Sequence, residues 1–117
     1  MPKFAYIELE TSGLDYQEDD VIKYCAKIIE DERVVDTFLE YAKPRKQLSP
    51  LVEKLTKITN NDLADCQPSN VVKQNFLQLV DDTIVLARNL DFIEKFLGIR
   101  FEKGIELCFH NLDDTQR

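Results

Sequence analysis

The spacing of apolar residues changes from strand-like to helical once along the chain, and this change restricts the fold more than any other feature. Three runs of β-favouring residues occupy residues 4–9, 21–29 and 34–41. From residue 50 the apolar residues follow helical spacing, except for one continuous apolar run at 83–87. This order predicts an α/β domain with a mixed sheet, in which an antiparallel hairpin lies beside parallel strands joined by a helical crossover.

The boundaries of the later elements follow from caps and turn residues. We expect short helices at 51–55, with Pro50 in the first turn, and near 60–64, capped by Asn60 or Asn61. A longer helix, capped by Ser69 or Asn70, carries an apolar stripe, and a helix at 91–97 ends at Gly98. Residues 105–109 fit either a strand or a helical turn. The predicted core of a four-stranded sheet contains Ile7, Leu9, Ile22, Ile28, Phe38, Phe76 and Val85.

Length and charge narrow the possible functions. A chain of 117 residues is expected to form one domain over 1–117, since domains typically have roughly 100–200 residues. The net charge of −7 argues against broad, sequence-independent binding to nucleic acid. It leaves open an enzyme that reaches phosphates through metal ions held by its own carboxylates. A basic run of Lys43, Arg45 and Lys46 could contact phosphates or form a solvated loop.

Cysteine usage and hydropathy point to a cytoplasmic protein. The cysteines Cys25, Cys66 and Cys108 are far apart and His110 is the single histidine, so the sequence offers no clustered zinc ligands. Reduced thiols in the cytoplasm are the simple interpretation. No segment approaches the ~20 apolar residues that a membrane span needs, so we expect no membrane partner.

Two acids at the end of the first predicted strand are candidate metal ligands. Glu8 and Glu10 are two residues apart, so their side chains point to the same face of a strand. Paired hard oxygen ligands on a rigid element suit Mg²⁺ or Mn²⁺. The spacing alone also describes two exposed acids at a strand end, which is the commoner case.

Four segments of the chain, at residues 4–14, 58–63, 85–97 and 112–117, resemble motifs of the DEDD (DnaQ-like) family of 3′–5′ exonucleases, the ribonuclease T and proofreading epsilon subunit type. Residues 4–14, FAYIELETSGL, resemble the first motif, in which apolar residues precede D-x-E-T-T-G-L. Residues 58–63, ITNNDL, are similar to G-I-T-N-x-x-L. Residues 85–97, VLARNLDFIEKFL, resemble V-A-H-N-x-x-F-D-x-x-F-L, and residues 112–117 resemble the end of H-x-A-L-x-D.

The resemblance implies a ribonuclease-H-like mixed sheet with flanking helices, and a site in which four acids hold two divalent metal ions. A histidine of the family activates water for phosphodiester cleavage. By position, the resemblance implies that Glu8, Glu10 and Asp114 are the metal ligands of the first and third motifs. The general-base histidine falls on Phe109, and the adjacent His110 is the candidate catalytic residue if the spacing slips by one.

The resemblance also implies a nucleic-acid contact surface. Thr11 of the first motif and the second-motif pair Arg88 and Asn89 occupy positions that would face the nucleic acid. Arg88 stands where the family pattern has histidine, and it could bind phosphate or pair with a nearby acid.

Several departures from the family pattern predict a loss of activity. Glu8 replaces an aspartate and moves the carboxylate outward by about 1.5 Å, where a misplacement of ~1 Å can cost on the order of 10²-fold in rate. The second-motif aspartate falls on Ile93, and Asp91 lies about 200° around the helix from that position, at ~100° per residue. The stretches between and after the last two motifs are short, so we expect a fold shortened at the C-terminus.

The sequence therefore predicts a degenerate 3′–5′ exonuclease-like domain with little or no nuclease activity. It would bind Mg²⁺ or Mn²⁺ weakly or not at all, and would recognise a nucleic-acid 3′ end or a partner protein. One alternative is a working metal-dependent 3′–5′ exonuclease on DNA or RNA. Another is a structural module that self-associates, most simply as a two-fold homodimer. The apolar residues that such a dimer would bury are Phe96, Leu97, Ile99, Phe101, Ile105, Leu107 and Phe109.

Overall fold

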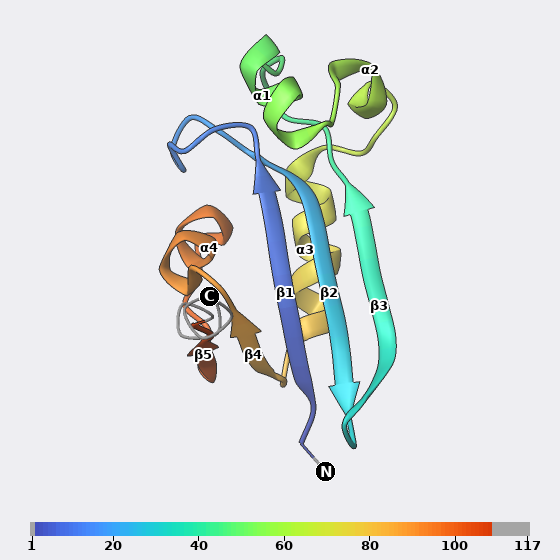
Figure 1. Ribbon diagram of the computed structural model, residues 1–117, viewed down its shortest axis with the longest axis vertical. Helices are drawn as coiled ribbons and strands as arrows, with labels where there is room; N and C mark the ends of the chain where they lie inside the picture. The colour runs from blue at the N-terminus through green and yellow to red at the C-terminus, as the bar shows by residue number, and fades with distance from the viewer. Residues whose placement is uncertain (1, 109–117) are drawn as a thin grey trace, which may run out of the picture.

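A five-stranded mixed sheet organises the chain in the computed structural model, which describes residues 2–108 (Figure 1). The strands lie in the order β3-β2-β1-β4-β5; β2 is antiparallel to β1 and β3, whereas β1, β4 and β5 run parallel. The elements are β1 (Phe4–Thr11), β2 (Val21–Glu30), β3 (Arg33–Tyr41), α1 (Pro50–Thr56), α2 (Asn60–Leu63), α3 (Ser69–Val80), β4 (Ile84–Ala87), α4 (Leu90–Leu97) and β5 (Gly104–Glu106). The predicted α/β architecture is confirmed, and the undecided segment near 105 forms the short fifth strand.

The predicted hairpin joins β2 and β3 through a tight two-residue turn. Asp31 and Glu32 both have positive φ, 53° and 64°, and Glu30 pairs with Arg33 on either side of them. Positive φ at both central residues produces the backbone twist that suits two adjacent strands. The turn therefore fixes the register of the hairpin.

Two predicted helix caps are wrong: another side chain caps α2, and no side chain caps α3. Thr59, not Asn60 or Asn61, caps α2 in a reciprocal capping box with Asp62. The Asn60 amide instead binds the backbone of Leu48, accepting from its N–H at 2.6 Å and donating to its carbonyl at 3.0 Å. The last residue before α3 is Pro68, so neither Ser69 nor Asn70 is its cap.

The hydrophobic core lies between one face of the sheet and helices α3 and α4. Buried residues of β1 and β4 join buried residues of both helices in one cluster, which includes Ala5, Ile7, Val85, Val72, Phe76, Ile93 and Leu97. Figure 1 shows α3 behind the sheet. Of the predicted core, five residues are buried, namely Ile7, Ile22, Ile28, Phe76 and Val85, while Leu9 and Phe38 are half-buried against the cluster.

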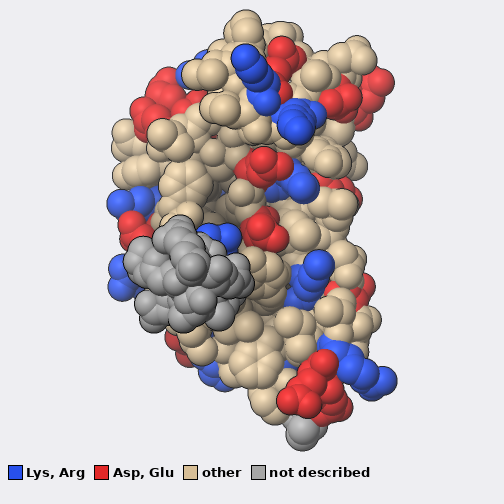
Figure 2. Space-filling view, viewed as in Figure 1, with Lys and Arg blue, Asp and Glu red and all other residues tan. Residues whose placement is uncertain are grey.

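The opposite side of the sheet, here called the open face, presents side chains of β1 and β2 that are half-buried or exposed. Its central residues are Tyr6, Glu8, Glu10, Lys23, Cys25 and Lys27. They alternate along each strand with the buried residues that face the helices, as the pleat of a strand requires. Figure 2 views this side of the molecule and shows acidic and basic groups interspersed near its centre.

The apolar residues of the C-terminal quarter divide between the core and the surface. Leu97 is buried, and Phe96 and Phe101 pack against the core. Ile99 and Ile105 are exposed, at 37% and 48%, while Phe109 lies outside the described residues. The proposed dimer surface is therefore smaller than the sequence suggested, and self-association stays a prediction.

The cysteines and helices of the described chain add two facts. Cys25, Cys66 and Cys108 are all free thiols. No helix within residues 2–108 has the length and hydrophobicity needed to cross a bilayer.

Candidate functional site

The first and second motifs meet where β4 ends beside the parallel strand β1, a position here called the motif junction. The last pair between β1 and β4 is Ile7 with Ala87, so the next residues are Glu8, within β1, and Arg88, just after β4. Tyr6 senses both charges: burial and then the Glu8 charge raise the pKa of its hydroxyl, while the Arg88 charge lowers it. The topology thus brings the first-motif acids and the second-motif basic residue together.

Glu8 and Glu10 lie on one face of β1, as their spacing predicted. Both carboxylates line a pocket of about 300 Å³ on the open face, together with Leu9, Lys23 and Cys25. Glu8 is exposed, whereas Glu10 is half-buried. The two acids therefore share one small cavity whose other walls come from β2.

Lys23 is the residue of this pocket that sequence reasoning missed. It is the cross-strand partner of Glu10, and its Nζ lies 3.6 Å from Glu10 Oε2. On its other side the ammonium lies 6.0 Å from the centre of the Tyr41 ring, within reach of a cation–π interaction. The pocket therefore contains a positive charge beside the acid that the resemblance assigns to metal.

The second motif places no carboxylate beside these acids. Ile93 stands at the position of the family aspartate, is 4% exposed and belongs to the hydrophobic core. Asp91 is exposed and pairs with Lys95 at 3.2 Å, one helical turn along α4. Asp91 and Ile93 thus point to different sides of α4, as expected from their separation around the helix: Asp91 is exposed and Ile93 is buried.

Asn89 has a structural role at the start of α4. Its φ of 53° and ψ of 51° are left-handed, a conformation that asparagine tolerates better than most residues. Its carbonyl accepts the Ile93 N–H at 3.1 Å, while its side chain makes no cap hydrogen bond. Backbone geometry alone accounts for an asparagine here, and its amide is available at the motif junction.

The loop that follows β1 is held by its own hydroxyl groups. The Thr11 hydroxyl donates to the Gly13 carbonyl at 2.6 Å, and the Ser12 hydroxyl accepts the Asp20 N–H at 3.0 Å. A side chain on Gly13 would displace the Asp19 carboxylate from its present position. The Thr11 side chain therefore shapes the loop beside the pocket.

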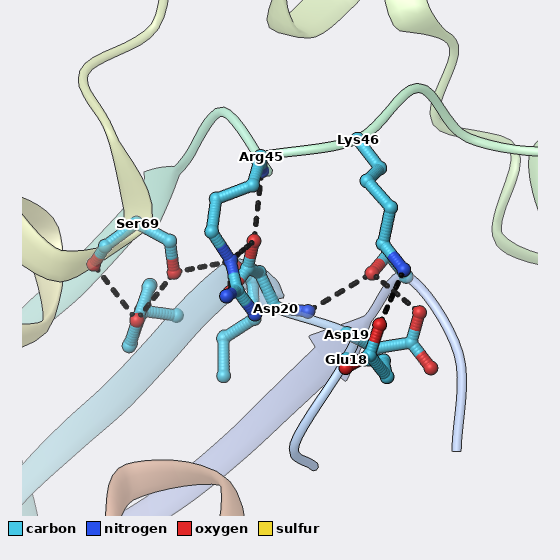
Figure 3. Close-up of polar contacts among 9 residues, drawn as sticks. Glu18, Asp19, Asp20, Arg45, Lys46 and Ser69 are labelled. Carbon is cyan, nitrogen blue, oxygen red and sulfur yellow. Dashed lines mark hydrogen bonds and ion pairs between the residues drawn. The ribbon is translucent and has the colours of Figure 1, made fainter. Parts of the chain in front are cut away.

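The basic run after β3 is paired with the acidic loop between β1 and β2 (Figure 3). The Arg45 guanidinium lies 3.1 Å from an Asp20 carboxylate oxygen that also accepts the Arg45 backbone N–H at 2.8 Å. Lys46 pairs with Glu18 at 3.2 Å. The hydrogen bond to Asp20 raises the pKa of Arg45. Of the two interpretations of this run, phosphate binding or a solvated loop, the structure favours a loop braced by ion pairs.

The remaining implied site residues, His110 and Asp114, lie outside the described residues. Within residues 2–108, no three His, Cys, Asp or Glu side chains are grouped so as to hold a metal ion. The described donors at the motif junction are the carboxylates of Glu8 and Glu10, one of them paired with Lys23. Within residues 2–108, these two carboxylates are fewer ligands than the four acids that the resemblance implies for a two-metal centre.

Solved structures with the same arrangement define the fold class as that of ribonuclease-H-like exonucleases. Escherichia coli exonuclease I in complex with a dT13 oligonucleotide matches with a TM-score of 0.72 and 20% identity, over 83% of this chain and 23% of that chain. Exonuclease X in complex with 5′ overhanging duplex DNA matches with a TM-score of 0.69 and 18% identity, over 97% and 63%. At these identities the likeness establishes the fold.

The chain belongs to the exonuclease family, whose family model, described as Exonuclease, matches residues 6–111. The PolC-type DNA polymerase III of Thermotoga petrophila is 31% identical over 104 residues, covering 89% of this chain and 8% of that protein. The 3′-5′ exonuclease DinG of Bacillus subtilis is 30% identical over 115 residues, covering 97% and 12%. The chain thus spans about a tenth of the length of these relatives, and the family resemblance read from its motifs is confirmed.

Proposed function

We propose that this chain is a nucleic-acid-binding domain of the exonuclease family with little or no nuclease activity. The observation that carries the proposal is Ile93, an apolar residue buried at 4% exposure where the family pattern has a metal-binding aspartate. A buried isoleucine cannot donate an oxygen to a metal ion. In a two-metal mechanism the ions clamp the attacking and leaving oxygens, so loss of a ligand removes stabilisation of the transition state.

The acids that remain support the same conclusion. Glu8 carries its carboxylate one methylene further out than aspartate would, and Glu10 is paired with Lys23. Weak binding of Mg²⁺ or Mn²⁺ by these two carboxylates is compatible with membership of the family. Two carboxylates leave most of a hard cation's coordination shell to water, so tight binding is not expected.

Binding of nucleic acid is supported by the fold and by the composition of the open face. Exonuclease I and exonuclease X were both solved with DNA. On this chain, Lys23 and Arg88 lie around the motif junction, and Tyr6 adds an aromatic ring beside them. Cations that contact the backbone and aromatic rings that stack on bases are the usual components of single-strand binding. We infer that the bound end is the 3′ end of a single strand.

The experiment is a turnover measurement on 5′-labelled single strands of DNA and RNA in Mn²⁺, with Glu10→Ala as the matched control. We expect wild type and Glu10→Ala to leave the strands equally intact, because the site lacks a ligand before the mutation is made. A ladder of products shortened from the 3′ end, present in wild type and absent in Glu10→Ala, would overturn the proposal in favour of a working exonuclease.

A further inference from the structure

A lysine ammonium occupies the pocket in which the family resemblance implies a metal ion. Lys23 Nζ lies 3.6 Å from Glu10 Oε2, and Lys23 is one of the five residues that line the pocket. The side chain of Lys23 is 31% exposed, so its ammonium is partly shielded and still reachable from solvent. This cation belongs to the chain itself and sits directly opposite Glu10 in the sheet.

The position of the ammonium is set by the sheet and not by chance contact of flexible groups. The β1–β2 register places Lys23 across from Glu10, and the β2–β3 register places it across from Tyr41. Directly opposed residues on antiparallel strands have side chains on the same face and in contact range. The carboxylate on one side and the aromatic ring on the other therefore hold the ammonium between them.

The Lys23 ammonium keeps N–H donors that a second anionic group could use without a divalent ion. Glu10 can engage only part of the three N–H groups of the ammonium, so the others can donate to another group. Lys23 lies on the open face beside the acids Glu8 and Glu10, and it is the positively charged residue among the five that line the pocket.

We propose that Lys23 is the fixed cation of this site and contacts a backbone phosphate of a bound single strand in place of a metal ion. This inference rests on the proposed function, since it assumes that the open face binds nucleic acid. It goes beyond that function by naming the residue that recognises the phosphate and by making the binding independent of divalent metal. Lysine recognises phosphate as a point charge, so one oxygen of the strand is enough for the contact.

The test measures the affinity of the 117-residue protein for a fluorescent oligothymidylate by anisotropy in EDTA, across a range of salt concentrations. Wild type should bind in EDTA with an affinity that added Mn²⁺ leaves unchanged. Lys23→Gln should weaken binding about tenfold and reduce the slope of log affinity against log salt by about 0.7, the value for one phosphate contact on a single strand. Lys23→Arg, which keeps the charge, should retain most of the affinity.

Lys27→Gln is the matched control, because Lys27 lies on the same strand and face as Lys23 but outside the pocket. Its effect should be less than about twofold, since solvent screens a charge that lies away from the bound phosphate. Equal losses in Lys23→Gln and Lys27→Gln would overturn the role of Lys23 and leave the proposed function standing. Binding by wild type only in Mn²⁺ would also overturn it. A wild type that binds no strand under any condition would overturn the proposed function itself.

Discussion

Ile93→Asp restores the acid of the family pattern, and its effect on stability reports where that side chain points. Ile93 is 4% exposed and packs in the core with residues of β1, β4 and α3. Truncating a buried isoleucine to a small residue costs about 2–5 kcal/mol, and an unpaired buried charge adds a penalty of several kcal/mol unless the group takes up a proton. We expect Ile93→Asp to lower the free energy of unfolding by about 3–5 kcal/mol at neutral pH, a large part of the ~5–15 kcal/mol of a typical domain.

The loss of stability should also depend on pH. Burial disfavours the charged form, so the new carboxyl has a higher pKa in the folded protein than in the unfolded chain. The folded state then binds more protons than the unfolded state above the ordinary pKa of aspartate, which is about 3.9. The free energy of unfolding therefore falls as pH rises from about 3.9 to the pKa of the carboxyl in the folded protein, by up to ~1.4 kcal/mol for each unit by which that pKa is raised. Ile93→Asp should be closer to wild type at pH 4 than at pH 8.

Urea unfolding followed by far-ultraviolet circular dichroism measures both effects. Ile93→Val is the matched control, since it removes one methyl group, adds no charge and should cost about 0.5–1.5 kcal/mol at either pH. An Ile93→Asp variant as stable as Ile93→Val at pH 8, and further stabilised by Mn²⁺, would refute the reasoning. It would mean that the side chain at this position reaches the carboxylates of Glu8 and Glu10.

Two further predictions concern the core and the surface. Tyr24→Phe removes a hydroxyl that donates to the Ser69 carbonyl at 3.0 Å, and should lower the free energy of unfolding by about 1 kcal/mol at neutral pH. Burial raises the pKa of Tyr24 from 10.0 to about 12. The stability that its protonated hydroxyl contributes is therefore complete below pH 10 and is lost as pH rises toward 12. In urea titrations between pH 10 and 12, wild type should lose ~2–3 kcal/mol more free energy of unfolding than Tyr24→Phe. We also expect a two-fold dimer that Ile105→Asp dissociates, and light scattering that gives 13.6 kDa for wild type over a hundredfold range of concentration would reject it. Phe101→Asp is unsuitable for that purpose, because Phe101 packs against the core and the substitution would unfold the protein.

The sheet and its helices could be predicted because their signals are local. Alternation along β2 placed Ile22 and Ile28 on a buried face, and the stripe of α3 placed Phe76 in the core. The short loop at Asp31 and Glu32 identified the hairpin. The helix caps were less predictable, since several Ser, Thr and Asn residues compete at each helix start and tertiary contacts decide among them. Ser69 illustrates this, because its hydroxyl donates to the Val21 carbonyl at 2.6 Å instead of capping α3.

The candidate site could be predicted only where it lies on one strand. Glu8 and Glu10 share a face by the geometry of β1 alone. Lys23 could not be placed beside Glu10, because the loop between β1 and β2 does not fix their register and an irregularity follows Glu10 in the pairing. The ion pairs of Arg45 and Lys46 likewise join segments that are distant in sequence. Pairing across the sheet, which the local sequence does not encode, determines the charge of the pocket.

Binding without cleavage is tested most directly by following one labelled single strand on the wild-type protein, first in EDTA and then after addition of excess Mn²⁺. Anisotropy reports binding and a denaturing gel of the same sample reports the length of the strand. We predict that the strand is bound in EDTA and keeps its full length after Mn²⁺ is added, with Glu10→Ala giving the same gel. Shortening of the bound strand from its 3′ end in wild type, abolished in Glu10→Ala, would contradict it.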